Sequence, residues 1–359
     1  MKTTLLQWVQ NNKEKLYFPR ISISPNAVSF LEKNQDLIVW HELSMNPKAI
    51  DLLKENIDKI DWYALSYNQS PDLISFLQME GNKLDRSILC NNQNENILLF
   101  LEKCMDDINF YVLSSNSNAI FLLEKYPERI NWDRLSSNIN AIHLLEKNLD
   151  KINWHQLSTN INGISILEKN LNKICWSRLS HNINAISILE KNVNKIHWIH
   201  LSGNVNAISI LEKNEDKIHW SQLSTNINAI SILEKNINKI NWIYLSENIN
   251  AIPILEKNLD KIHWDRLSGN KNAIYILEKN LDKINWYKLS CNENAIDLLQ
   301  KNMDRIYWNA LSFNESIYVM DYTFYKERMD VHREELMKKV FHPARLLYYL
   351  EMGYDFDDV

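Results

Sequence analysis

Glycine and proline are both scarce in this chain, with 5 and 7 copies among its 359 residues. The turns must therefore be made largely without glycine, the residue that usually ends a helix. Long apolar runs are also missing, because no stretch approaches the ~18 apolar residues that read as a membrane helix. The apolar run near the N-terminus is too short and too polar for a signal peptide. We expect a soluble, intracellular protein that makes no membrane contact.

Cysteine is rare as well, and its four copies share no short spacing; they are Cys90, Cys104, Cys175 and Cys291. This pattern predicts free thiols in a reducing compartment and argues against a disulfide framework. A strong positive charge is also absent. The formal net charge of −5 argues against a general polyanion binder, although a local basic stripe is compatible with it.

Catalytic signatures are missing too: the sequence contains no HExxH, GxSxG, P-loop or GxGxxG motif. His197, His219 and His263 occupy one position in three repeated units, but neighbouring helices lie ~8–10 Å apart. Two ligands of one zinc ion lie only ~3–3.5 Å apart, given Zn–N distances near ~2.0–2.1 Å. These histidines are therefore predicted to cap helices or to lie on the surface. The chain is predicted to be no enzyme and to bind no metal or cofactor.

A repeat of 22 residues dominates what is present. Its tryptophan recurs at Trp132, Trp154, Trp176, Trp198, Trp220, Trp242, Trp264, Trp286 and Trp308. Toward the N-terminus the same position holds Phe110, Arg86, Trp62, Trp40 and Phe18. The two steps that flank Arg86, from 62 to 86 and from 86 to 110, are 24 residues long instead of 22. A fixed period of this size is typical of a solenoid. We predict about 14 units over residues 16–321, with irregular units at about 62–109. Residues 1–15 form an N-terminal cap, and 322–359 form a C-terminal helical cap or docking module.

Each unit is predicted to hold two short helices, as residues 152–173 illustrate. Asn153 caps the first helix, and Asn162 caps the second, because short polar side chains accept the free N–H groups of a first turn. Asn170 replaces glycine as the left-handed residue that ends the second helix. Helices this short are marginal in isolation, so stacking must stabilise them. The predicted fold is an all-α solenoid or superhelix with almost no strand, on the order of 120 Å along its path.

The unit resembles the tandem repeats of uncharacterised proteins of giant DNA viruses that infect amoebae. Two motifs carry the resemblance: Asn-Ala-Ile-x-Ile-Leu-Glu-Lys-Asn, as at 184–192, and Ile-x-Trp-x-x-Leu-Ser-x-Asn, as at 196–204. The stretch 336–345 is similar to the ends of such proteins. The resemblance implies a viral protein in the host-cell cytoplasm, or alternatively in the virion. It implies no activity and no catalytic residues, and Arg86 and the two 24-residue units depart from the pattern.

Two charged stripes follow the repeat. Glu168 and Lys169 have copies in most units, and a second lysine recurs at 151, 173, 195, 217, 239, 261 and 283. Stacked units would place these side chains in rows, and the simplest interpretation is a solvated outer face with weak ion pairs. The alternative is a track for phosphates, because single-strand binders combine basic grooves with aromatic platforms.

The units differ at three places: the two residues after the aromatic position and the residue after the repeated serine. A constant framework with a variable face is how solenoids present an extended binding surface. Unconstrained surface positions would give the same pattern, so both interpretations stay open. Tyrosine and arginine are favoured at interface hot spots. The candidate partner-binding residues are Tyr244, Arg266, Tyr275, Tyr287 and Lys288.

Arg86 is the other candidate site. A lost tryptophan should weaken the stack locally and change the curvature of the solenoid there. A hinge or irregular site would explain it, and so would drift of an older repeat.

The favoured function is a non-enzymatic scaffold that binds a protein partner through its variable face, with Asp330–Val359 as a docking segment. A nucleic-acid binder that uses the lysine stripe is the first alternative. A structural protein that self-associates as a homo-oligomer, through its open ends or through the edge that carries the tryptophans, is the second.

Overall fold

The computed structural model describes residues 2–340 together with 342 and 352. The described chain is built from regularly repeated pairs of short helices and contains only two strands of three residues, which confirms the predicted all-α repeat solenoid. The first helix of each unit begins at the aromatic position, or at Arg86 in the fourth unit. These helices are α2 (Phe18–Ile23), α4 (Trp40–Met45), α6 (Trp62–Leu65), α8 (Arg86–Leu89), α10 (Phe110–Leu113), α12 (Trp132–Leu135), α14 (Trp154–Leu157), α16 (Trp176–Leu179), α18 (Trp198–Ser202), α20 (Trp220–Thr225), α22 (Trp242–Leu245), α24 (Trp264–Leu267), α26 (Trp286–Ser290) and α28 (Trp308–Leu311).

The second helix of each unit carries the Ile-x-Ile-Leu-Glu motif or its variants. These helices are α3 (Val28–Glu32), α5 (Ile50–Lys54), α7 (Ile74–Glu80), α9 (Glu95–Leu101), α11 (Ile120–Lys125), α13 (Ile142–Glu146), α15 (Ile164–Glu168), α17 (Ile186–Lys191), α19 (Ile208–Glu212), α21 (Ile230–Lys235), α23 (Ile252–Glu256), α25 (Ile274–Glu278) and α27 (Ile296–Gln300). Short 3₁₀ turns lead into most first helices. They are η1 (Lys13–Lys15), η2 (Gln35–Leu37), η3 (Ile57–Lys59), η5 (Gly81–Lys83), η6 (Glu102–Asp107), η7 (Pro127–Arg129), η8 (Leu171–Lys173), η9 (Val193–Lys195), η10 (Glu215–Lys217), η11 (Ile237–Lys239), η12 (Leu259–Lys261) and η14 (Met303–Arg305).

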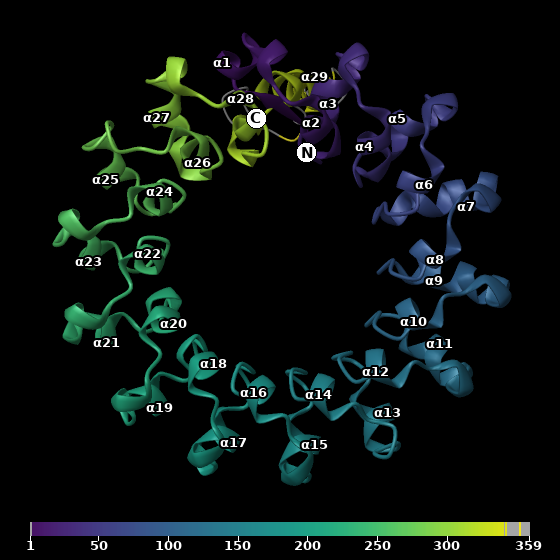
Figure 1. Ribbon diagram of the computed structural model, residues 1–359. Coiled ribbons are helices and arrows are strands. Elements are labelled where there is room, and N and C mark those ends of the chain that lie inside the picture. The colour runs from purple at the N-terminus through teal and green to yellow at the C-terminus, as the bar shows by residue number, and fades with distance from the viewer. Residues whose placement is uncertain (1, 341, 343–351, 353–359) are drawn as a thin grey trace.

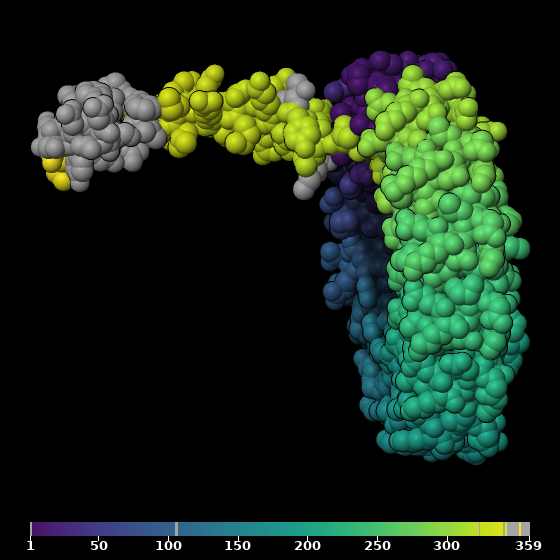
Figure 2. All heavy atoms as spheres, turned by 90° about the vertical axis from the view of Figure 1, so that its left-hand side faces the viewer, coloured from purple at the N-terminus to yellow at the C-terminus, as the bar shows by residue number. Residues whose placement is uncertain are grey.

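The units close into a ring around a central opening, with the first and last units side by side (Figure 1). Seen edge-on, the ring is a band of nearly constant width (Figure 2). Because the predicted ~14 stacked units share one full turn, each unit is rotated by about 26° relative to its neighbour. The repeat pattern did not determine this curvature, and the expected open path with two capped ends is replaced by a closed one.

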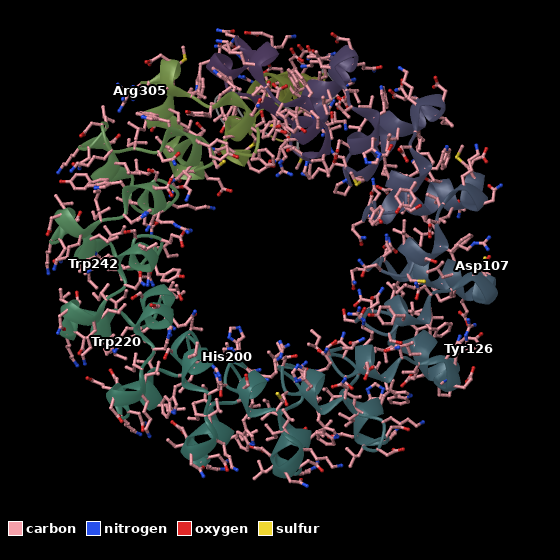
Figure 3. All side chains as sticks on the ribbon, viewed as in Figure 1. Asp107, Tyr126, His200, Trp220, Trp242 and Arg305 are labelled. Carbon is pink, nitrogen blue, oxygen red and sulfur yellow. The ribbon has the colours of Figure 1, made fainter. Side chains whose placement is uncertain are left out.

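The first helices form the inner layer of the ring and the second helices form the outer layer (Figure 1). Between the layers lies a continuous core to which each unit contributes the same positions, such as Ile152, Leu157, Ile166 and Leu167. Each such side chain contributes roughly 1.5–3 kcal/mol when it is fully buried. The tryptophans are half-buried, and Trp220 and Trp242 lie toward the outer rim, whereas His200 lies at the edge of the opening (Figure 3).

Hydrogen bonds from side chains to backbone join each unit to the next. The repeated serine accepts from a backbone N–H of the following unit, as Ser158 Oγ does from Cys175 N at 3.0 Å. The buried asparagine two residues later reaches back to the preceding unit. Asn182 Nδ2 donates to the carbonyls of Ser158 and Asn160, at 3.2 and 3.1 Å. The recurring Ser and Asn are therefore structural links.

The local roles predicted for three asparagines have different outcomes. Asn153 caps the first helix, because its side chain accepts from Gln156 N, and this prediction is confirmed. The N-cap role of Asn162 is wrong, since its Nδ2 donates to the carbonyl of Ile139 in the preceding unit. The left-handed conformation of Asn170 is also wrong, because its φ is −134°. Its side chain instead donates to the carbonyl of Ile166 and satisfies the end of the helix.

The junction between the last and first units reproduces the ordinary contact between neighbours. Tyr17 N donates to Ser312 Oγ at 2.8 Å, the same link that Cys175 and Ser158 make in the middle of the array. Lys15 Nζ lies 5.1 Å from the ring centroid of Trp308, as lysines elsewhere lie over tryptophan. The ring is therefore continuous through its seam.

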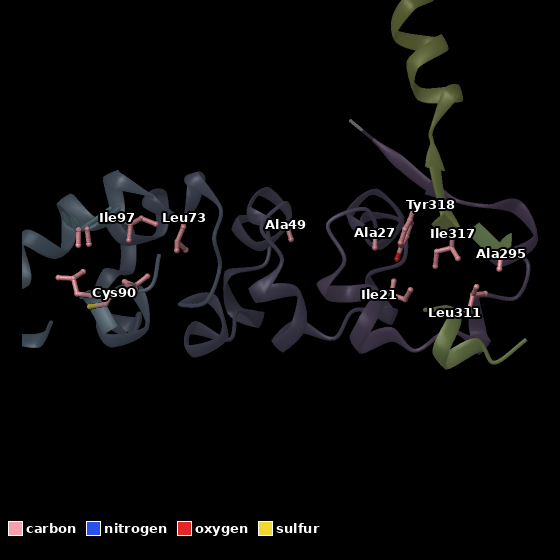
Figure 4. Close-up of a cluster of buried hydrophobic side chains, with 14 of the residues drawn as sticks. Ile21, Ala27, Ala49, Leu73, Cys90, Ile97, Ala295, Leu311, Ile317 and Tyr318 are labelled. Atoms are coloured by element: carbon pink, nitrogen blue, oxygen red, sulfur yellow. The ribbon is translucent and has the colours of Figure 1, made fainter. Parts of the chain in front are cut away.

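Other contacts occur at the seam. Strand β1 (Thr3–Leu5) pairs antiparallel with β2 (Tyr318–Met320), which follows the turn η15 (Glu315–Ile317), and helix α1 (Gln7–Gln10) brings Trp8 against Trp308. Figure 4 shows buried residues of both chain ends, including Ile21, Ala27, Ile317 and Tyr318, in one cluster. Residues 2–15 and the end of the array therefore join each other and do not cover two separate ends.

Helix α29 (Tyr322–Val340) follows β2 and stands away from the ring (Figure 2). Its start is tied to the N-terminal strand, because Lys2 N donates to the Tyr325 hydroxyl at 2.8 Å. Of the predicted docking segment Asp330–Val359, the part from 341 onward lies almost entirely outside the described residues. No helix in the described part of the chain is both long and apolar enough to cross a membrane.

Candidate functional site: the inner surface of the ring

The variable positions lie on the helices that surround the opening. We define the inner surface as the two residues after each aromatic position and the residue after each repeated serine. Many of its large side chains are exposed, although the framework beside them is buried. The exposed members include Tyr63, Tyr67, Tyr111, Ile199, Ile243, Tyr244, Tyr287 and Phe313. The structure thus separates a constant buried framework from a variable exposed surface.

The five candidate partner-binding residues do not all lie together. Tyr244, Arg266, Tyr287 and Lys288 belong to the inner helices α22, α24 and α26. Tyr275 belongs to the outer helix α25, where Lys279 Nζ lies 3.7 Å from its ring centroid. The candidate patch on the inner surface is therefore reduced to four residues.

The charged members of this patch are paired with inner-surface carboxylates. Arg266 Nη1 donates to Glu247 Oε1 at 2.5 Å, and this hydrogen bond raises the pKa of Arg266. Lys288 Nζ lies 2.9 Å from Asp265 Oδ2 and, with Asn285, holds the pKa of Asp265 below its ordinary value. The two tyrosines form no such ion pair, and Tyr287 packs edge-on against Tyr307, with ring centroids 5.8 Å apart.

The inner surface is close to electrically neutral. It carries five side chains that are positive at pH 7: Arg20, Arg134, Arg178, Arg266 and Lys288. It carries four carboxylates: Glu42, Asp133, Glu247 and Asp265. Proteins that bind nucleic acid through a channel or groove carry a strong excess of positive charge there. This surface lacks that excess.

The lysine stripe contacts the tryptophans. Lys151, Lys173, Lys217, Lys239, Lys261 and Lys283 each place Nζ between 4.6 and 5.0 Å from the ring centroid of the tryptophan in the first helix of the same unit. A cation over an indole face is attracted by the ring quadrupole, worth roughly 0.5–1 kcal/mol at exposed sites. The stripe thus joins the first helix of a unit to the end of that unit.

Arg86 takes part in a variant of the same contact. It occupies the tryptophan position, and Asp107 occupies the lysine position at the end of the same unit, so an Arg86–Asp107 ion pair replaces the cation–ring pair. Asp107 lies at the outer rim (Figure 3). In the same unit Cys90 replaces the repeated serine, and burial raises the pKa of its thiol to about 11. Arg86 therefore makes a contact within its own unit and does not belong to the inner surface.

The histidines have two kinds of role. His219 Nδ1 and His263 Nδ1 accept from backbone N–H groups of their own helices at 3.4 Å, which confirms the predicted capping. His197 makes no such bond, and its ring lies against His200, with centroids 4.3 Å apart. His200 and His181 are close on the inner surface. Sequence reasoning did not single out His181 and His200, although their signal, histidines at variable positions of consecutive units, was visible.

The described residues contain no group of three or more His, Cys, Asp or Glu side chains arranged to hold a metal ion. Comparison of the chain with models of known protein families, with curated proteins and with solved structures finds no match in any of the three. The resemblance to repeat proteins of giant viruses therefore depends on the repeat motif and stays a prediction.

Proposed function

We propose that this ring is a non-enzymatic scaffold that binds a protein partner through its inner surface. The observation that carries the proposal is the separation of constant and variable side chains. The repeated Leu, Ser and Asn of each first helix and the turn after it are buried, whereas most of the positions that differ are exposed or half-buried on the inner helices. A solenoid that binds a partner needs this division, because its framework must stay constant while its contact residues match the partner.

The chemistry of the inner surface supports a protein partner over a nucleic acid. Tyrosines recur on it, and tyrosine is one of the residue types that dominate binding energy at protein interfaces. Its charges are nearly balanced, and most of the second lysines of the repeat lie over tryptophan rings. Self-association through open ends has less support, because the first and last units contact each other.

A pair of matched tyrosines tests the proposal. Tyr287 on the inner surface and Tyr275 on the outer layer are 55% and 58% exposed. We expect Tyr287→Ser to weaken capture of a protein partner from an extract about tenfold or more, which is typical of a hot-spot side chain. Tyr275→Ser should leave capture unchanged. Equal effects of both substitutions, or no stoichiometric protein partner, would contradict the proposal. A gel shift with nucleic acid that weakens steeply with salt would favour the alternative.

A further inference from the structure

A hollow of about 470 Å³ lies on the inner surface where four consecutive units meet. Its lining comes from the variable positions of the units that begin at Trp154, Trp176, Trp198 and Trp220. This volume is within the range of small-molecule sites, roughly 300–1,000 Å³. The hollow can therefore accept an amino-acid side chain or a small organic molecule.

Gly203 opens this hollow. Its backbone has φ −86° and ψ −9°, which any residue adopts, so the local conformation does not require glycine. A Cβ atom added at Gly203 would meet no atom closer than 3.6 Å. Other units carry Thr, His, Glu or Phe at the same position. Glycine at this position thus leaves space in the hollow and is not required by the backbone conformation.

The hollow is lined by a positively charged side chain, Arg178, that has no acidic partner among the described residues. Arg178 Nε donates to His155 Nε2 at 3.0 Å. This bond orients the guanidinium and leaves both of its Nη groups available to a ligand. Among the described residues no carboxylate forms an ion pair with Arg178, unlike Arg266 and Lys288. The inner-surface positions of these four units contain no acidic residue at all, and no carboxylate lines the hollow. The planar fork of arginine matches the two oxygens of a carboxylate or phosphate.

Two histidines lie next to this arginine. His200 Nδ1 lies 2.8 Å from the carbonyl of Ser177, so Nδ1 carries the proton and Nε2 has no hydrogen-bond partner in the described chain. The ring of His181 packs edge-on against His200, with centroids 6.3 Å apart. Gln222 adds an amide, and Ile199 adds an exposed apolar side chain. The hollow therefore offers several polar groups and one apolar contact, with no negative charge.

We propose that this hollow binds an anionic group, a carboxylate or a phosphate, attached to an apolar stem. The Nη groups of Arg178 bind the anionic oxygens, His181 and His200 lie beside them, and Ile199 packs on the stem. The inference rests on the proposed function in one respect, since the anion is expected to be a side chain of the protein partner in the opening. A free small-molecule anion would share this chemistry.

The test titrates the full-length protein with phenyl phosphate and with phenylacetate, and uses benzyl alcohol as the neutral control. We expect the imidazole ¹H NMR signals of His181 and His200 to shift saturably with both anions and not with the alcohol. Arg178→Met should weaken the binding of the anions about tenfold or more, since hydrogen bonds to charged groups are lost. Gly203→Leu fills the hollow and should abolish saturation. The matched control is Arg134→Met, which removes an inner-surface arginine two units away and should change nothing.

The outcomes separate this inference from the proposed function. The absence of saturable shifts, or equal shifts in the Gly203→Leu protein, would overturn the inference while partner capture by the inner surface could still stand. Saturable binding of the anions by a protein that captures no partner would support a free small-molecule anion as the ligand and overturn the proposed function. Loss of partner capture in Arg178→Met, with capture kept in Arg134→Met, would place the partner's anionic side chain in the hollow.

Discussion

The buried asparagines are the residues that join one unit of the ring to the next. Asn226 is representative: its Nδ2 donates to the carbonyls of Ser202 and Asn204, both at 3.1 Å. Its Oδ1 accepts from Asn228 N at 3.0 Å. One side chain thus satisfies three backbone groups, two of which belong to the preceding unit. An alanine could satisfy none of them.

We expect Asn226→Ala to lower the free energy of unfolding by about 3 kcal/mol, because buried carbonyl and amide groups would lose their partners. Asn228→Ala is the control, since its side chain makes one exposed bond, to the carbonyl of Val205, and should cost less than about 1 kcal/mol. Urea denaturation followed by circular dichroism measures both. Similar midpoints for the two variants would contradict the linking role of the buried asparagine.

A pH-dependent contact involves Asp61 and His41. Hydrogen bonds from Ala64 N and from His41 hold the pKa of Asp61 below its ordinary 3.8, and the bond to Asp61 raises the pKa of His41 above 6.5. The contribution of Asp61 is present above pH 3.8 and is lost as pH falls through its folded pKa. The contribution of His41 is present below pH 6.5 and is lost as pH rises through its folded pKa.

Asp61→Asn should therefore lower the stability of the fold mainly between pH 3.8 and pH 6.5. Asparagine keeps the capping bond, as Asn153 does in its own unit, but it carries no charge. We expect a melting temperature about one or two degrees below that of the wild type in this window, since exposed pairs contribute little. The difference should shrink at pH 2.5 and at pH 9. A difference that is constant across pH would exclude the charged pair as its cause.

At the scale of elements, the contact between the first helix of a unit and the end of that unit exists in two forms. In most units a lysine or arginine lies over the aromatic ring of its own unit, as Lys261 does over Trp242 at 5.0 Å. In the fourth unit the ring is replaced by Arg86 and the cation by Asp107. Both positions differ together, so this contact is kept where the tryptophan is missing.

The coupling between these two positions is testable with a double-mutant cycle. Arg86→Trp leaves a carboxylate beside an indole, and Asp107→Lys places two cations side by side, so each single variant should be less stable than the wild type. The double variant restores the common pair and should recover about 1 kcal/mol or more relative to the sum of the single effects. Additive effects in urea denaturation would show that the two positions do not interact.

At the scale of the whole molecule, closure removes the exposed apolar ends that an open solenoid must cover. The seam combines the ordinary contact between units with contacts found nowhere else in the described chain. Glu315 accepts from Arg20, Ser24 and Asn26, at 3.0 to 3.3 Å, and Leu5 of β1 is buried opposite Tyr318 of β2. These contacts are concentrated in residues far apart in the sequence.

Leu5→Lys should open the ring, because a buried position would receive an unpaired charge. Small-angle X-ray scattering is expected to show a larger maximum dimension and the loss of the hollow-ring profile. Leu99→Lys makes the same substitution at an exposed position of α9 and should leave the profile unchanged. A closed profile for Leu5→Lys would show that the ordinary contact between Tyr17 and Ser312 suffices for closure.

The unit could be predicted from the sequence because its determinants are local and repeated. The period of Trp154 and its copies predicts the helix pair, and the cap at Asn153 follows from side-chain chemistry at a helix start. The sequence predicts that Asn162 caps a helix of its own unit and that Asn170 is left-handed, but Asn170 has a φ of −134° and donates to the carbonyl of Ile166 in its own unit. Asn162 in fact bonds to Ile139 of the preceding unit, and the position of that carbonyl depends on the stacking. Tyr275 was included in the candidate patch for a similar reason, because closeness along the repeated sequence does not show whether a residue belongs to the inner or the outer layer.

The sequence alone determined that this protein is an α-helical repeat with a constant framework and three variable positions in each unit. Tertiary structure decided that the units form a ring, that the variable positions surround its opening, and that the hollow beside Arg178 carries no negative charge. The physical reason is that closure depends on a small rotation repeated at every contact between units. A 22-residue pattern records which residues meet at each contact, but the rotation itself arises only when the side chains are packed together.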